Sequence, residues 1–401
     1  MKWKIAIGVI LIIAALMRFY KLPENPPGLY IDELSIGYNA YSILKTGYDE
    51  HGAFLPISFQ AFGEYKLPVY IYLTSISISL FGLTPFAVRF PSAFLGTLTV
   101  GFVYLLIKTL ASTDKKNREQ SGQVFGLLSA LLLAISPWHI QFSRGGFEAT
   151  VALFFITAGL YVFLKGKQWY TMAGILCFML SFYTYNAARI FVVLFLPVFL
   201  LTLYLKKRIH QREAVPIILC TILLFLPVVP SVIDGSFFTR GLATSAFVES
   251  SWRFPTTFPL LSHLMTFLAN YFSYVSPAFL FFNGDGIGRH GVREMGMFYY
   301  FDIPLLIIGV FGVLQRKWSW QKFVLCAWFL LGIFPASLNR PSPHSLRALI
   351  SVVPLIIVSA YGLYTIVSWL QEKSKLIKTV GFVICVTVMF YNIGLYQWFY
   401  W

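Results

Sequence analysis

Residues 189–205 read RIFVVLFLPVFLLTLYL, an apolar run in which the initial arginine is the only charged residue. Its length approaches the roughly 20 residues that an α-helix needs to cross the hydrocarbon core of a bilayer. Apolar runs recur along the whole chain of 401 residues, of which 58% are hydrophobic and 12% are charged, and the mean hydropathy is +0.72. This composition argues against a soluble protein and indicates an all-α polytopic membrane protein.

We expect about eleven transmembrane helices in a single domain that covers residues 1–401. The expected spans are 3–20, 84–108, 123–141, 148–165, 168–186, 189–205, 214–232, 302–315, 320–338, 346–370 and 377–396. The apolar stretch Pro68–Gly82 is short and bounded by proline and glycine, so we expect an interfacial or re-entrant helix there. The first apolar segment resembles a signal peptide, but no small-residue cleavage site follows it, and we interpret it as a retained span.

The distribution of charge predicts the orientation in the membrane. Basic residues gather in short loops on one side of the expected bundle, which indicates a cytoplasmic N-terminus and a multi-pass protein of the cell membrane. The formal charge is +15, but these clusters lie between apolar runs instead of on one solvated face, so we expect no nucleic acid as a partner. All but four of the 16 acidic residues fall on the outer side. The outer side has a first loop (21–83), a short turn (141–148) and a long third loop (233–300).

Asp32 and Glu33 follow the chain-breaking sequence Pro26-Pro27-Gly28 in the first loop. Asp32 to Thr46 is typical of a helix closed by Gly47. In a structural interpretation Asp32 caps this helix and Glu33 interacts with its dipole. In a functional interpretation the pair performs chemistry, because carboxylates near lipid are costly unless they pair, meet water or react.

Further polar residues lie in the expected outer segments, and each allows a structural and a functional interpretation. Glu64 and Lys66 either extend to the headgroup boundary or contact substrate, with Lys66 binding a lipid phosphate. Arg144 and Glu148 either pair with each other or face the first loop. The other candidates for contacts to a phosphate or a sugar are Arg189, which is equally suited to anchor the interface, and Arg289, His290, His344 and Arg347.

The sequence indicates no cofactor. The four cysteines, Cys177, Cys220, Cys326 and Cys385, lie inside apolar runs without metal-ligand spacing, and no cluster of His, Asp and Glu is diagnostic of a metal. A divalent metal stays open, since Asp32, Glu33 and Glu148 could jointly hold one.

Carboxylates together with cations suit the transfer of a sugar from a lipid phosphate. A carboxylate can take the proton of an acceptor hydroxyl as the hydroxyl attacks the anomeric carbon. Nearby anions stabilise an oxocarbenium-like transition state. The leaving phosphate needs cations, which Lys and Arg supply.

Four motifs carry a resemblance to a known family. They are Pro-Pro-Gly-Leu-Tyr-x-Asp-Glu (26–33), Lys-Leu-Pro-Val-Tyr (66–70), Arg-Phe-Pro-Ser-Ala (89–93) and Ser-Pro-Trp-His-Ile-Gln-Phe-Ser-Arg (136–144). Together they resemble membrane glycosyltransferases of the C-type superfamily, related to protein O-mannosyltransferases and lipid A aminoarabinose transferases. The resemblance covers essentially the whole chain and is strongest over residues 22–190.

The resemblance implies a polyprenyl-phosphate-linked sugar donor, an acceptor protein, lipid or glycan, inverting transfer on the extracytoplasmic face, and surface-lying helices in the first loop. It assigns Asp32 as the base, Glu33 to support it or contact the acceptor, and Lys66 to the donor phosphate. Glu148 matches an acid that is often Asp in relatives, and Lys-Leu-Pro replaces their Lys-Pro. Relatives often continue beyond the last span, so a C-terminal extracytoplasmic domain could be missing here.

Two other classes of function compete with an enzyme. A transporter or flippase of a lipid-linked substrate would place its polar residues near the bilayer midplane, often on broken helices in repeated halves. Most ionisable residues here fall at the expected outer boundary, and no paired halves are evident, which favours the enzyme. A non-enzymatic scaffold would leave the acids on the outer side unexplained.

Overall fold

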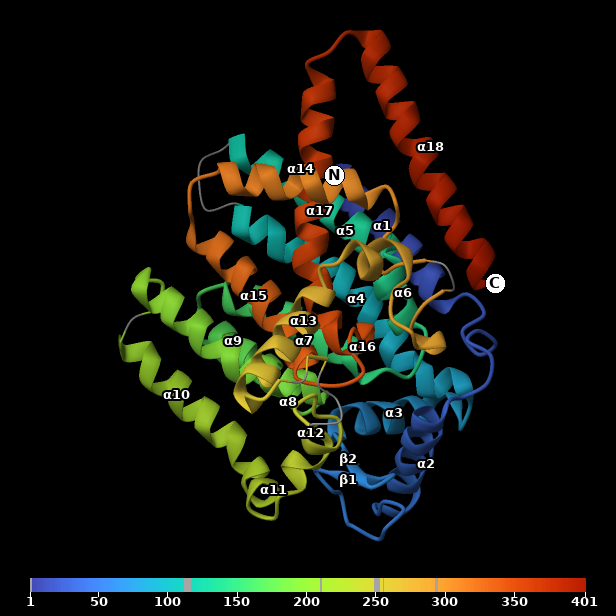
Figure 1. Cartoon of the computed structure of the whole chain (residues 1–401), viewed down its shortest axis with the longest axis vertical. Helices are drawn as coiled ribbons and strands as arrows, with labels where there is room; N and C mark the ends of the chain where they lie inside the picture. Colours follow the sequence, from blue (N-terminus) through green and yellow to red (C-terminus); the bar gives the residue numbers. More distant parts are fainter. Residues whose placement is uncertain (1, 112–116, 210, 249–252, 255, 293–294) are drawn as a thin grey trace.

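The computed structural model describes residues 2–111, 117–209, 211–248, 253–254, 256–292 and 295–401 (Figure 1). The helices of the first half are α1 (Lys2–Phe19), α2 (Ile31–Thr46), α3 (Pro68–Phe81), α4 (Pro85–Ala111), α5 (Asn117–Ile135), α6 (Pro137–Ser143), α7 (Glu148–Phe163), α8 (Gln168–Phe182) and α9 (Asn186–Leu205). Those of the second half are α10 (Gln211–Phe225), α11 (Val229–Ile233), α12 (Thr239–Ala243), α13 (Pro259–Ser273), α14 (Asp302–Gln315), α15 (Trp320–Ser337), α16 (Ser345–Ala348), α17 (Val352–Gln371) and α18 (Lys375–Tyr400).

The all-α class is confirmed, and each expected span coincides with one helix or with consecutive helices. Six helical segments of the described chain are long and apolar enough to cross a membrane, or seven if the bent pair α5–α6 forms one span. The helices α7, α8 and α14 are apolar but shorter. The count of eleven spans therefore remains a prediction. The expected interfacial segment is helical, as α3, and packs against α2 and α4.

The segment expected as one span over 123–141 is broken. Helix α5 ends at Ile135, and α6 starts at Pro137 with its axis turned by 58°. The buried Arg18 of α1 donates hydrogen bonds to the carbonyls of Leu133 (3.2 Å) and Ala134 (3.0 Å) beside this break. Backbone groups freed inside a membrane need such donors. The bend brings residues 144–148 toward the first loop.

Helix α2 begins one residue before the expected start and ends where expected. Its N-cap is Tyr30, not Asp32, and the side chain of Glu33 reaches back to the Tyr30 backbone N–H at 3.2 Å. Gly47, with φ of 78°, closes the helix in the left-handed conformation that glycine adopts at little cost. The capping role considered for Asp32 is thus wrong, and its side chain is available for another partner.

The first loop contains a two-stranded hairpin that was not predicted from the sequence. Strand β1 (Phe59–Ala61) pairs antiparallel with β2 (Glu64–Lys66). Phe62 and Gly63 form the two-residue turn, and both have positive φ, as the twist of a tight hairpin requires. Because side chains alternate along a strand, Glu64 and Lys66 share one face of β2.

Candidate functional site

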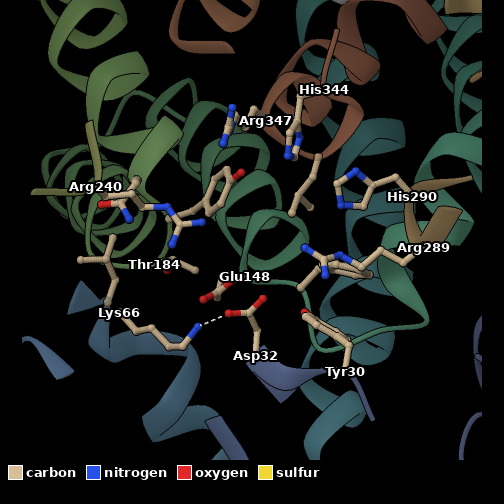
Figure 2. A pocket seen from close by; sticks show the side chains of 15 residues that line it. Tyr30, Asp32, Lys66, Glu148, Thr184, Arg240, Arg289, His290, His344 and Arg347 are labelled. Carbon is tan, nitrogen blue, oxygen red and sulfur yellow. Dashed lines mark hydrogen bonds and ion pairs between the residues drawn. The ribbon is translucent and has the colours of Figure 1, made fainter. Parts of the chain in front are cut away.

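A cavity open to solvent lies where seven segments of the chain converge. The lining comes from the start of α2, the end of β2, the starts of α7 and α9, α12, the loop before α14, and the turn that leads into α16 (Figure 2). The segments expected on the outer side therefore meet at one place. Of the candidate residues, the lining includes Asp32, Lys66, Glu148, Arg289, His290, His344 and Arg347.

Asp32 and Lys66, which both line the cavity, form an ion pair (Figure 2). The Lys66 side chain is only 2% exposed, whereas that of Asp32 is 28% exposed. The pair joins the first turn of α2 to the end of the hairpin. A buried ammonium requires a partner such as this carboxylate, and the exposed part of Asp32 remains accessible from the cavity.

Glu148, the first residue of α7, faces the cavity beside Asp32, close enough for the two carboxylates to interact (Figure 2). Tyr30 lies next to both. Its hydroxyl donates to the Gly146 carbonyl at 3.0 Å. The guanidinium carbon of Arg289 lies over the Tyr30 ring, 5.3 Å from the ring centroid. Burial, followed by the charges of Glu148, Glu33 and Asp32, raises the pKa of Tyr30 well above its ordinary value. Tyr30 is therefore a neutral hydrogen-bond donor.

Further cations line the cavity. Arg240 of α12 pairs with Glu64, so the third loop is fastened to the hairpin that carries Lys66. Arg347 donates to the Arg340 carbonyl at 2.9 Å and also lines the cavity. With Lys66 and Arg289, four cationic side chains face one space that also contains two carboxylates. Such an arrangement can bind an anion next to a proton acceptor.

Glu33, implied either to support Asp32 or to contact the acceptor, does not line the cavity. It is 1% exposed and forms a bidentate ion pair with Arg89, at 2.9 Å from Nε and 3.1 Å from Nη2. Its Oε1 also accepts from the Gly146 N–H at 2.7 Å. Arg89 donates further to the carbonyls of Leu22 and Pro26. This buried cluster fixes the first loop against the 144–148 turn, and so positions Asp32 beside Glu148.

Glu33 packs closely against Gly146, so a side chain at position 146 should destabilise the fold. A Cβ at this position would meet Cγ of Glu33 at 2.9 Å, whereas a Cβ at Gly286 would meet nothing within 4 Å. We expect Gly146→Ala to lower the free energy of unfolding by about 1–3 kcal/mol through overpacking. The matched change Gly286→Ala should leave it nearly unchanged. Unfolding of both variants in detergent, followed by circular dichroism, checks this difference; equal stabilities would show that the turn relaxes freely.

Arg144 and Arg189, both expected to contact a donor phosphate, lie outside the cavity lining. Arg144 is 1% exposed and donates to the carbonyls of Met17, Tyr20 and Asn25, while its guanidinium stacks on Trp401 at 4.7 Å. It fastens the end of α18 to the first loop. Arg189 packs its guanidinium between the rings of Phe182 and Phe237. The guanidinium groups of both arginines are therefore occupied by protein groups outside the cavity.

His290 and His344 enter the cavity from two segments far apart in the sequence, and their ring centroids are 4.7 Å apart. His290 Nδ1 lies 2.9 Å from Oδ2 of Asp285. Burial, together with the nearby Arg347, lowers the pKa of His344 to about 3. Among the described residues, Asp285, His290 and His344 form a group whose possible metal-ligand atoms lie within 4.8 Å of one another. No pattern in the sequence was diagnostic of this group. The metal set considered from the sequence, Asp32, Glu33 and Glu148, does not form, because Glu33 is paired with Arg89.

Sequence reasoning did not assign a role to Tyr30, Arg89, Arg240 or Asp285. Arg89 had a usable signal, since an arginine inside an apolar run demands a buried partner. Asp285 lies in a glycine-rich loop, where its neighbours gave no indication of His344. Arg240 had no local signal, because its partner Glu64 is 176 residues away.

Comparison with known proteins adds to this geometry. No protein-family model matches the sequence, and the search of curated proteins found no match. Among solved structures, the Archaeoglobus fulgidus oligosaccharyltransferase tethered to an acceptor peptide superposes with a TM-score of 0.61 at 14% identity, over 98% of this chain and 54% of that one. ArnT from Cupriavidus metallidurans bound to undecaprenyl phosphate superposes with a TM-score of 0.56 at 15% identity, over 96% and 63%.

The chain thus spans between 54% and 63% of the length of these two structures. Nearly all of it takes part in the superposition despite the low identity. The chain therefore shares its fold with the archaeal oligosaccharyltransferase and with ArnT.

Proposed function

We propose that this protein transfers a sugar from a polyprenyl-phosphate-linked donor to an acceptor hydroxyl. The observation that carries the proposal is the cavity in which the accessible carboxylate of Asp32 lies among Lys66, Arg240, Arg289 and Arg347. Two structures of the same fold were solved with lipid phosphates: the Archaeoglobus enzyme with a dolichol-phosphate and ArnT with undecaprenyl phosphate. The cations of this cavity suit the same headgroup chemistry.

The reaction is a single displacement at the anomeric carbon. The acceptor oxygen forms a bond to this carbon while the bond to the phosphate oxygen breaks, and that electron pair leaves with the polyprenyl phosphate. The acceptor proton goes to Asp32, which acts as the general base. Attack from the face opposite the phosphate inverts the anomeric configuration. Glu148, beside Asp32, stabilises the positive charge that develops on the sugar ring.

Lys66 couples donor binding to the base. Before the donor binds, its ammonium is paired with Asp32. A donor phosphate in the cavity competes for this ammonium, so the carboxylate is freed to accept a proton only when the leaving group is in place. Arg289 and Arg347, which have no ion-pair partner among the described residues, supply charge to the departing phosphate.

The orientation of the protein follows from the same proposal. All segments that line the cavity belong to the side of the bundle that the basic loops predict to be outside, and the cavity would open to the extracytoplasmic face of the cell membrane. The N-terminus would be cytoplasmic. The acceptor is a protein, a lipid or a glycan with a free hydroxyl.

The proposal is tested with purified protein and a panel of polyprenyl-phosphate sugars in the presence of hydroxylated acceptors. Release of the free polyprenyl phosphate, followed by mass spectrometry, is the expected result for at least one donor. Movement of an intact donor between the leaflets of a proteoliposome without release would instead identify a flippase.

Removing the ammonium of Lys66 should mainly weaken the binding of the donor. We expect Lys66→Met, which retains an apolar stem, to weaken donor binding by about 10- to 100-fold, the value of a charge-assisted hydrogen bond. The apparent acceptor affinity should change much less. Lys45→Met, at an exposed lysine of α2, is the matched control. Titrations of donor and acceptor in the release assay check both values, and an unchanged donor affinity would refute this role.

A further inference from the structure

Asp285 holds the imidazole of His290 in one orientation. Oδ2 of Asp285 accepts from the backbone N–H and the hydroxyl of Ser345, at 2.7 Å and 2.6 Å, and lies 2.9 Å from Nδ1 of His290. A carboxylate with these partners is an acceptor, so Nδ1 of His290 carries the hydrogen. In the neutral ring, Nε2 of His290 is then left with a bare lone pair.

Two ring nitrogens at this place lack a partner among the described residues: Nε2 of His290 and Nδ1 of His344. The two histidines are 0% and 7% exposed, and their ring centroids are 4.7 Å apart. A buried nitrogen without a hydrogen bond costs free energy comparable to a lost hydrogen bond. Both nitrogens belong to residues that line the same cavity (Figure 2).

We propose that His290 and His344 bind one Zn²⁺ ion, with Asp285 as the residue that orients His290. One donor atom from each of the three residues can be chosen so that all lie within 4.8 Å of one another. Imidazole nitrogens favour zinc over magnesium or calcium, which prefer oxygen ligands. A histidine whose second nitrogen donates to a carboxylate is the common arrangement at zinc sites.

A metal ion would supply the partner that the two ring nitrogens lack, and it does so better than the donor phosphate would. Phosphate oxygens are hydrogen-bond acceptors, so a neutral His290, whose Nε2 carries no hydrogen, cannot donate to them. A single acceptor hydroxyl could donate to one nitrogen but would leave the other unpaired. A cation bound to both satisfies both, and its open positions face the cavity, where water or an oxygen of the substrate can complete the coordination.

The ion would fasten two segments that carry other residues of the cavity. His290 follows Arg289 in the loop before α14, and His344 precedes α16, which carries Arg347. Binding of the metal stands independently of the transfer reaction. Only its further role, as a positive charge next to the donor phosphate, rests on the proposed function.

The test uses the full chain in detergent, stripped of metal with a chelator and titrated with Zn²⁺ by calorimetry. We expect one ion per chain and no comparable binding of Mg²⁺. His290→Ala and His344→Ala should each lower the affinity at least about 100-fold, and Asp285→Asn about 10- to 100-fold, as changes next to the ligands do. The control is His263→Ala, since Nε2 of this histidine in α13 lies 3.1 Å from the Phe247 carbonyl. Co²⁺ in place of Zn²⁺ should show the visible bands of tetrahedral coordination.

Wild-type protein that binds no stoichiometric zinc would overturn the proposal, and this outcome does not depend on whether any variant folds. Unchanged affinity in folded His290→Ala and His344→Ala variants would overturn it as well. Because zinc binding is measured without a donor, and sugar transfer is measured by release of the lipid phosphate, either proposal can fail alone.

Discussion

Asp32→Asn should reduce sugar transfer by about 10²- to 10⁴-fold, the usual contribution of a general base. The amide has nearly the shape of the carboxylate but cannot take the acceptor proton. Its oxygen can still accept from Lys66, so the cavity should keep its form. Donor binding should persist, since a neutral amide competes with the phosphate for the Lys66 ammonium less than a carboxylate does. Release of polyprenyl phosphate under single-turnover conditions, together with equilibrium binding of the donor, measures the two effects separately.

Two control substitutions test whether the loss of transfer is specific to Asp32. Asp234→Asn changes an exposed aspartate of the third loop that accepts from the Ser236 N–H, and we expect normal transfer. Glu148→Gln changes the neighbouring carboxylate of the cavity and should lower the rate less than Asp32→Asn. Normal turnover by Asp32→Asn would remove Asp32 as the base, and a larger loss in Glu148→Gln would transfer the role to Glu148.

Glu33→Gln should produce the largest loss of stability, about 3–5 kcal/mol, because it leaves the charge of Arg89 buried without its partner. In the wild type, the carboxylate of Glu33 accepts four hydrogen bonds, from two guanidinium nitrogens and from the backbone of Tyr30 and Gly146. An amide has only one oxygen, and its NH₂ group would oppose another donor. Both side chains of the ion pair are 1% exposed, so water cannot replace the lost contacts.

An exposed ion pair of the same loop is the matched control. Nζ of Lys21 lies 3.8 Å from Oε2 of Glu24, and the two side chains are 50% and 69% exposed. Glu24→Gln should cost at most about 1 kcal/mol, as surface pairs do. Equilibrium unfolding in mixed micelles, followed by tryptophan fluorescence, compares the two variants. Similar losses for Glu33→Gln and Glu24→Gln would show that the buried cluster does not hold the first loop in place.

The helices were predictable because lipid leaves the backbone few alternatives. An apolar run in a bilayer must satisfy its own N–H and C=O groups, so α4, α9 and α15 follow from their composition. The end of α2 was also predictable from Gly47. The break between α5 and α6 has a visible cause in Pro137, but the donor that makes it tolerable, Arg18, comes from another helix.

The site was only partly predictable, since its geometry depends on contacts distant in sequence. Asp32 and Glu33 are adjacent, and in a helix successive side chains point about 100° apart, so only one of them can face a given cavity. Which one does so is decided by Arg89, which pairs with Glu33. Lys66 owes its position to a hairpin of three-residue strands, too short to leave a clear sequence pattern.

The anomeric configuration of the product tests the central claim most directly. With two carboxylates, Asp32 and Glu148, in one cavity, a double displacement through a covalent glycosyl intermediate is the chemical alternative, and it would retain the configuration of the donor. A base that activates the acceptor for a single displacement gives inversion. Nuclear magnetic resonance of the glycosylated acceptor made by the wild-type protein should therefore show the anomer opposite to that of the donor. A product with the donor's configuration would contradict the account.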